Sequence, residues 1–255
     1  MKRILLSVLT IAAVSAIGVA ATRAFFSDVE TSSGNTFQAG TLDLEISSQC
    51  TYNGIASNQC GTWEQRDLSP TADKFFNFTD LKPGDWGENT IDFKILTNDA
   101  WMCANINFTQ HQALADYLNV FWWIDADGNN QLGANEKVLY DGPRTIAQWI
   151  TAGGGTGSLP LTFADSYLNW ETWTGGPSGN TTPIPGNTTK YLGVGWCFGS
   201  LALSAGNGVG FTCNGGGSDQ NLAQGTSIVA DLTFTVEQYR NNSSFLCPEH
   251  RPAAP

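Results

Sequence analysis

Alternating apolar and polar residues along the chain predict β-strands. The longest run covers residues 228–237, where an aliphatic or aromatic residue occupies every second position from Ile228 to Val236. Residues 42–46 and 91–95 repeat this period of two, which is typical of strands with one buried face. Further apolar runs predict strands at residues 101–108, 120–124, 137–140 and 191–203.

Helical signals are few. The best candidates are residues 112–119 and 143–151, the second of which begins with proline in its first turn and ends before a run of glycines. The strand runs are separated by three stretches rich in Gly, Pro and Asn, at residues 151–160, 174–190 and 205–220. Strands joined by such loops are typical of a two-sheet sandwich. We therefore expect an all-β sandwich with long loops and one or two short helices.

The first residues have the layout of a secretory signal peptide. Two basic residues precede an apolar run over residues 4–21, and a stretch rich in small residues ends at Ala24. We expect signal peptidase to remove residues 1–24 by cutting between Ala24 and Phe25. The alternative is a retained membrane anchor, because the run is almost long enough to span a bilayer. After cleavage we expect the protein to have no membrane attachment. We expect it to be secreted and to lie outside the cell or at the cell surface.

The remaining chain reads as one domain over residues 25–247, followed by a disordered tail at residues 248–255. The tail contains proline and lacks an apolar stretch that could anchor it. A hydrophobic content of 41% is sufficient for a core. The chain has 12 Lys and Arg against 23 Asp and Glu, a net charge of −11, and no basic cluster. Because phosphate binding requires clustered basic residues, we expect no nucleic-acid partner.

All six cysteines lie in the part that we expect to be exported. They are Cys50, Cys60, Cys103, Cys197, Cys213 and Cys247. An even count in an exported protein predicts disulfides, although the sequence cannot fix the pairing. The short loops that they would close favour Cys50 with Cys60 and Cys197 with Cys213. A zinc site is poorly supported because the sequence has no C-x-x-C pair and only two histidines.

Residues 125–136 have the oxygen-rich spacing of a calcium loop. The expected ligands stand at loop positions 1, 3, 5, 7 and 12, which are Asp125, Asp127, Asn129, the backbone carbonyl of Gln131, and Glu136. Asn130 stands where the motif has glycine, but asparagine tolerates left-handed geometry. Because an apolar strand precedes the loop, we expect a structural calcium site between strands. The alternative is an Asx-rich turn that binds no ion.

Two motifs carry a resemblance to a known family. Residues 24–28 (AFFSD) and 34–44 (GNTFQAGTLDL) resemble the mature start of the TasA/camelysin family, secreted proteins processed by a dedicated signal peptidase. Residues 80–85 (DLKPGD), followed by a strand and residues 98–100 (NDA), resemble that family's LKPGD turn. Beyond residue 110 the likeness to the fibre-forming members fades.

The resemblance implies a jelly-roll fold and assembly into extracellular fibres of a biofilm matrix. Fibre-forming members polymerise by donor-strand exchange, in which the mature N-terminal segment of one subunit completes the sheet of the next. By this likeness residues 25–37 are the donor strand, and copies of the chain are the partners. The apolar anchors of this donor are Phe25, Phe26, Val29 and Phe37. The alternative is that the segment is the first strand of its own domain.

The matching Lys82-Pro83-Gly84-Asp85 segment predicts a type II turn. Pro83 fixes φ at the second position of the turn, and Gly84 supplies a positive φ at the third. We expect Lys82 and Asp85 to form a solvated pair, so the motif is interpreted as scaffold and not as a site.

Other function classes have less support. Camelysin relatives are associated with metallopeptidase activity, but the sequence lacks an H-E-x-x-H motif, and His111 and His250 cannot supply three histidine ligands. A calcium-dependent carbohydrate-binding surface is the other alternative, with glycans as candidate partners. Its aromatic platform would consist of Tyr167, Trp170 and Trp173. The sequence therefore favours a non-enzymatic structural subunit.

Overall fold

The computed structural model describes residues 42–57, 59–171, 174–175, 181–204 and 209–250. The predicted cleavage point and the whole predicted donor segment, residues 25–37, lie outside these ranges. Among the described residues, no helix has the length and apolar character that crossing a membrane requires.

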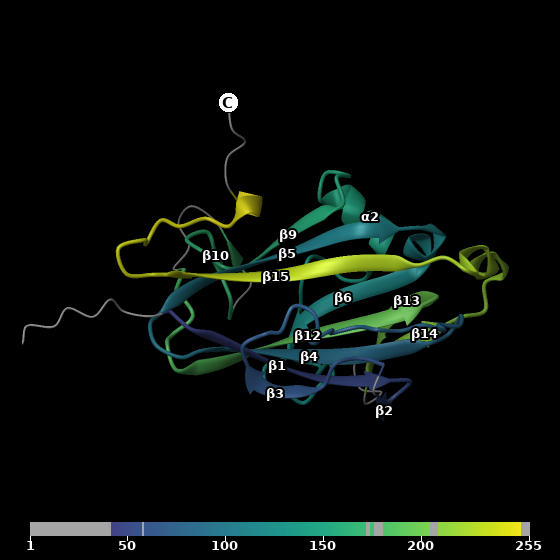
Figure 1. Ribbon diagram of the computed structural model, residues 1–255, viewed down its shortest axis with the longest axis horizontal. Helices are drawn as coiled ribbons and strands as arrows, with labels where there is room; N and C mark the ends of the chain where they lie inside the picture. Colours follow the sequence, from purple (N-terminus) through teal and green to yellow (C-terminus); the bar gives the residue numbers. More distant parts are fainter. Residues whose placement is uncertain (1–41, 58, 172–173, 176–180, 205–208, 251–255) are drawn as a thin grey trace, which may run out of the picture. The chain divides into compact units, whose positions relative to one another are not determined.

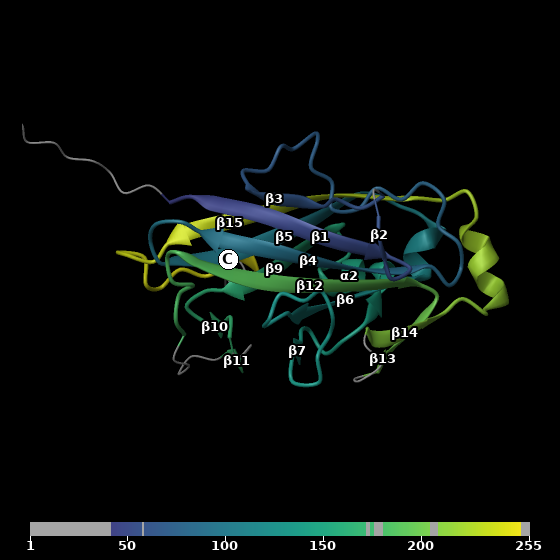
Figure 2. The same cartoon turned by 90° about the horizontal axis from the view of Figure 1, so that it is seen from below.

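A larger antiparallel sheet forms one layer of the domain. Its strand order is β2-β1-β4-β12-β6-β7, with β3 also paired to β1 and β8 to β6. The strands are β1 (Leu44–Tyr52), β2 (Ile55–Ala56), β3 (Trp63–Arg66), β4 (Trp86–Ile95), β6 (Leu118–Ile124), β7 (Lys137–Val138), β8 (Arg144–Thr145) and β12 (Thr188–Phe198). Figure 2 shows β1, β4, β12 and β6 side by side in this order.

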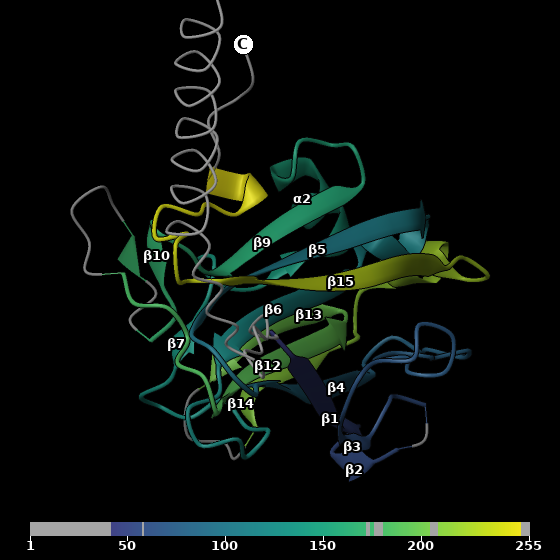
Figure 3. The same ribbon diagram turned by 60° about the vertical axis from the view of Figure 1, so that its left-hand side comes forward.

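A smaller sheet of three antiparallel strands forms the second layer. Its order is β15 (Ile228–Gln238), β5 (Ala100–His111) and β9 (Ser158–Ala164), and these strands run next to one another in Figures 1 and 3. Two short hairpins stand apart from both sheets: β10 (Leu168–Asn169) with β11 (Thr174–Gly175), and β13 (Ser200–Ser204) with β14 (Gly210–Asn214).

The long strands from β4 onward alternate between the two sheets. β4, β6 and β12 belong to the larger sheet, whereas β5, β9 and β15 belong to the smaller one. Each connection between them therefore crosses from one layer to the other, which is the wrapping of a jelly roll. The prediction of an all-β two-sheet sandwich is confirmed.

The main core lies between the two sheets because each strand directs alternate residues inward. Phe93 of β4 is fully buried, and its ring centroid lies 5.8 Å from that of Phe163 in β9 and 5.0 Å from that of Phe234 in β15. Trp122 of β6 packs against Trp149, with ring centroids 4.6 Å apart. Aromatic contacts thus join both edges of the smaller sheet to the larger one.

The helix expected at residues 143–151 is the single α-helix of the described residues, α2 (Ile146–Ala152). It begins later than predicted because Arg144–Thr145 pairs with β6 as β8. The Thr145 side chain accepts a hydrogen bond from Gln148 N, and the Gln148 side chain accepts one from Thr145 N, which forms a capping box.

The helix expected at residues 112–119 is not formed. Only a single 3-10 segment, η1 (Ala113–Asp116), occurs there, and β6 already begins at Leu118. Gln112 precedes η1 without a capping hydrogen bond from its side chain. Pairing of β6 with β12 therefore takes the residues that a longer helix would need. The other 3-10 segments are η2 (Ser218–Ala223) and η3 (Pro248–His250).

Two predicted strands are shorter than expected. The strand predicted at residues 137–140 ends at Val138, because Tyr140 and Asp141 adopt positive φ angles of 52° and 65°. The strand predicted at residues 191–203 is interrupted at Gly199, whose φ is 145°, and continues as β13 in a separate hairpin. Positive φ angles of this kind are incompatible with a continuous strand.

All six cysteines form disulfides. Cys50–Cys60 and Cys197–Cys213 match the predicted short loops, and Cys103–Cys247 links residues 144 positions apart. Such a set indicates an oxidising environment. The prediction of a disordered tail from residue 248 is wrong for residues 248–250, which form η3 and pack against β9. Residues 251–255 lie outside the described ranges.

Candidate metal centre and open sheet edge

The loop between β6 and β7 brings three carboxylates together. Single carboxylate oxygens of Asp125, Asp127 and Glu136 all lie within 4.8 Å of one another. Asp125 follows the last residue of β6 and is fully buried. Oxygen donors converging from one loop are suited to a hard divalent cation. The structure thus unites three of the five predicted ligand residues.

The buried Asp125 carboxylate accepts hydrogen bonds from the Thr90 side chain and from the backbone of its own loop. Thr90 Oγ1 donates to Oδ2 at 2.7 Å, Asn130 N donates to Oδ2 at 3.0 Å, and Asn129 N donates to Oδ1 at 3.2 Å. Burial raises the pKa of Asp125, and these hydrogen bonds oppose part of that rise. A cation would favour the ionised carboxylate still more.

Glu136 closes the loop from its far end. Its Oε1 accepts a hydrogen bond from Ala126 N at 2.6 Å, and its Oε2 accepts one from Gly133 N at 2.8 Å. Asn130 has the left-handed φ of 61° that the loop requires at that position. The side-chain oxygen of Asn129, a predicted ligand, instead accepts a hydrogen bond from Gln131 N at 2.8 Å.

A second, smaller core covers the outer face of the larger sheet beside this loop. It contains Phe121 and Trp123 of β6, Leu132 of the loop, and Phe211 of β14. The rings of Trp123 and Phe121 lie over Gly193 and Gly195 of β12, where any Cβ would overlap them. Glycines within a strand can mark such close contacts.

Glu88 of β4 is buried on this outer face and was not predicted as a site residue. Its exposed fraction is 4%, and its Oε1 has no hydrogen-bond partner among the described residues. Burial, followed by the nearby charge of Asp125, raises the pKa of Glu88 to about 8. Thr51 stands opposite Glu88 on β1, and its hydroxyl also lacks a described partner. No local pattern in the sequence indicates this burial.

The edge strand β15 is open on one side. Among the described residues it pairs only with β5, over the full length of the strand. Its inward-facing residues, from Ile228 to Val236, pack on the core but are only half-buried, and the alternate residues are exposed. The edge therefore offers unpaired backbone groups beside an incompletely covered apolar face.

The predicted LKPGD turn forms as expected, but its charged pair does not. Gly84 has a φ of 96°, and Asp85 N donates to Lys82 O at 2.9 Å. Lys82 Nζ contacts Asp80 at 2.6 Å and not Asp85. The Asp85 carboxylate instead accepts a hydrogen bond from Tyr52 Oη at 2.6 Å, so it fastens the turn to β1.

The predicted aromatic platform for sugars is not formed by Trp170. This residue is 3% exposed, and its ring lies 5.4 Å from that of Phe163 in the main core. Tyr167 is exposed but packs against His250, and Trp173 lies outside the described residues. Neither His111 nor His250 belongs to the described carboxylate cluster.

Comparison with known proteins adds no family assignment. The chain matches no protein-family model and no curated protein. The resemblance to the TasA/camelysin family, carried by residues 24–28, 34–44 and 80–85, therefore stays a prediction.

Proposed function

We propose that this chain is a non-enzymatic, secreted subunit of an extracellular fibre or biofilm matrix, assembled from copies of itself by donor-strand exchange. In this proposal the donor is residues 25–37 of one copy, freed by removal of residues 1–24. The acceptor is the edge of β15 in the next copy. The observation that carries the proposal is that, among the residues that the structure describes, this 11-residue strand pairs on one side only and has a half-buried apolar face.

The chemistry of β15 supports its role as acceptor. Protected edge strands commonly contain proline, lysine or an inward-facing charge. β15 contains none of these, because Asp231 and Glu237 lie on its exposed face. An added strand would pair the free backbone groups and cover the apolar residues, with alternate donor side chains directed toward the core. Three of the four apolar anchors, Phe25, Val29 and Phe37, stand at odd positions and would share one face of such a strand.

Electron microscopy of the processed protein, beginning at Phe25, tests the proposal. We expect filaments from this protein and none from a chain that begins at Gln38. Globular monomers from the processed protein under all conditions would contradict strand exchange.

A matched pair of substitutions in β15 tests the acceptor. Leu232→Lys places a charge on the half-buried face and should abolish filaments. Thr233→Lys places the same charge on the exposed face and should leave them intact. Near-identical melting curves of the two variants would show that the difference lies in assembly. Equal filament formation by both folded variants would exclude β15 as the acceptor.

We also propose that residues 125–136 bind calcium as a structural ion. Asp125, Asp127 and Glu136 would hold it, because their carboxylate oxygens converge and the loop spacing is that of a calcium loop. The ion would neutralise repulsion among these groups and fix the β6–β7 connection against the outer face of the larger sheet.

A further inference from the structure

The opposite edge of the smaller sheet, formed by β9, is closed to strand addition. Pro160 lies in the middle of β9 and has no N–H to donate. The N–H of Ser158, two residues earlier, donates to Thr156 Oγ1 at 3.4 Å, within its own chain segment. Residues two apart in a strand direct their backbone groups to the same side, so these two positions offer no free donor.

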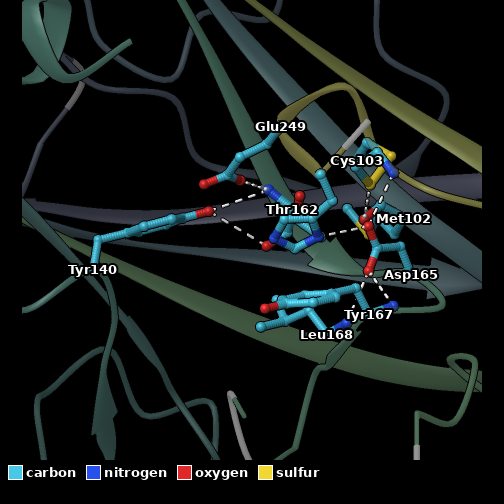
Figure 4. The surroundings of a disulfide bond; sticks show 10 residues. Met102, Cys103, Tyr140, Thr162, Asp165, Tyr167, Leu168 and Glu249 are labelled. Carbon is cyan, nitrogen blue, oxygen red and sulfur yellow. Dashed lines mark hydrogen bonds and ion pairs between the residues drawn. A yellow bond between two sulfur atoms is a disulfide. The ribbon is translucent and has the colours of Figure 1, made fainter. Parts of the chain in front are cut away.

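The next position along this edge is capped by side chains. Thr162 N donates to Tyr140 Oη at 3.1 Å and to Glu249 Oε2 at 3.0 Å, and Tyr140 Oη also donates to Thr162 O at 3.4 Å. Figure 4 shows Tyr140 and Glu249 approaching Thr162 together. Both backbone groups of Thr162 are therefore occupied on the side that faces away from β5.

Glu249 is brought to this edge by the C-terminal strap, which we define as residues 242–250. Cys247 is bonded to Cys103 of β5, and Cys247 N donates to Asp165 Oδ2 at 2.9 Å. The His250 ring bonds to the same carboxylate oxygen at 2.8 Å. Asp165 itself is fully buried. The strap is thus fixed by one covalent bond and one buried carboxylate (Figure 4).

The strap also meets the chain just beyond β9. Ser166 N donates to Phe245 O at 2.9 Å, which is a backbone hydrogen bond of the kind that an added strand would make. At the start of the strap, Trp101 Nε1 donates to Asn242 O at 2.8 Å. The strap therefore occupies a backbone donor just beyond β9, at Ser166, in addition to the capped Thr162 within β9.

We propose that the β9 edge is a latent surface for pairing with a strand of a second copy of this chain, and that the C-terminal strap together with Pro160 and Tyr140 keeps it closed. The inference rests on the proposed strand exchange at β15. With β9 closed, the smaller sheet of each subunit has β15 as its single acceptor edge, so strand exchange at this sheet gives unbranched filaments. With β9 open, the smaller sheet has two acceptor edges.

A triple variant of the processed chain tests this inference. Pro160→Val restores an N–H, whereas Tyr140→Phe and Glu249→Ala remove both caps of Thr162. Tyr140→Phe keeps the ring that packs 5.8 Å from Trp149. We expect branched or laterally joined filaments by electron microscopy, in contrast to single filaments of the parent. Unbranched filaments from the folded triple variant would overturn the proposal.

Mass photometry in a Leu232→Lys background separates this inference from strand exchange at β15. In that background the parent should be monomeric, and the triple variant should show at least a tenfold larger associated fraction. Asp141→Asn, which changes the exposed carboxylate next to Tyr140, serves as the control and should stay monomeric. A monomeric, folded triple variant would refute the latent edge even if β15 accepts donors normally.

Discussion

The two faces of β4 bury side chains of largely opposite kind, although the inner face also buries Asn89, which is hydrogen-bonded to Ser48. The inner face carries Ile91, Phe93 and Ile95 into the main core, where each is at most 1% exposed. The outer face carries Glu88 and Thr90, which are also buried, beside the Asp125 loop. One strand therefore supplies both an apolar core, which stabilises the fold at every pH, and a polar layer whose free energy depends on protons and cations.

The difference arises from what covers each face. The smaller sheet covers the inner face with aromatic side chains, among them Phe163 and Phe234. The outer face is covered by the second core and by the loop of residues 125–136, which places carboxylates next to buried strand residues. Burial of an unpaired carboxylate is costly, so a group such as Glu88 is retained at the expense of stability.

The inner face should give the largest effect on stability. Phe93→Ala removes a fully buried ring that contacts both edge strands of the smaller sheet, and we expect it to lower the free energy of unfolding by about 3–5 kcal/mol. Lys94→Ala, at the next position on the other face, should change it by less than ~0.5 kcal/mol. Denaturant unfolding of both variants measures the difference. Similar costs for the two would show that the faces are not energetically distinct.

The outer face should give a smaller effect that depends on pH. Burial raises the pKa of Glu88 from its usual 4.5 to about 8, so the folded state holds this proton more tightly than the unfolded chain does. Its contribution to stability is complete below pH 4.5 and is lost as pH rises through about 8. Glu88→Gln should therefore raise the free energy of unfolding at pH 8 by on the order of 3 kcal/mol, and hardly at all at pH 4.5.

The control for this prediction is Glu237→Gln on the exposed face of β15. It removes a carboxylate without burial and should alter the free energy of unfolding by less than ~0.5 kcal/mol at either pH. Thermal or denaturant unfolding at the two pH values provides the measurement. A Glu88→Gln effect that is the same at pH 4.5 and pH 8 would show that this carboxyl is not the pH-sensitive group.

The contrast between the faces also explains how far the sequence could predict the fold. Period-two alternation identified β15 and the core of β4, because one face of each strand is clearly apolar. The predicted strand covered only residues 91–95, so it assigned no face to Glu88 or Thr90. The burial of these two residues depends on the second core and on the loop after β6, which are distant in the chain and carry no local signal at β4.

The structure confirms the part of the predicted site that depends on the spacing of residues within one loop. Positions within one loop fix the approach of Asp125, Asp127 and Glu136, so the spacing predicted their convergence. The two short disulfide loops were predictable for the same reason. The Cys103–Cys247 bond was not predicted, because it joins residues 144 positions apart. The ordered strap that it anchors was missed because its hydrogen bonds to Asp165 and Thr162 are also long-range.

Calcium should produce the smallest of the three effects on the free energy of unfolding. For a loop of extracellular affinity, about 10 mM calcium should raise the free energy of unfolding by about 1–3 kcal/mol. Asp125→Asn should remove this gain, and Asp141→Asn should preserve it. Thermal melts with calcium and with chelator give the measurement. No calcium response in the parent protein would exclude the ion from residues 125–136.

A bound cation should also change the pH behaviour of the outer face. The charge of Asp125 contributes to the raised pKa of Glu88, and calcium at that carboxylate would offset this contribution. The gain from Glu88→Gln at pH 8 should therefore be smaller with calcium than with chelator, although burial keeps part of it. A gain that is independent of calcium, in a protein that calcium stabilises, would mean that the ion and Glu88 are not coupled. The outer face would then consist of two separate electrostatic sites instead of one layer.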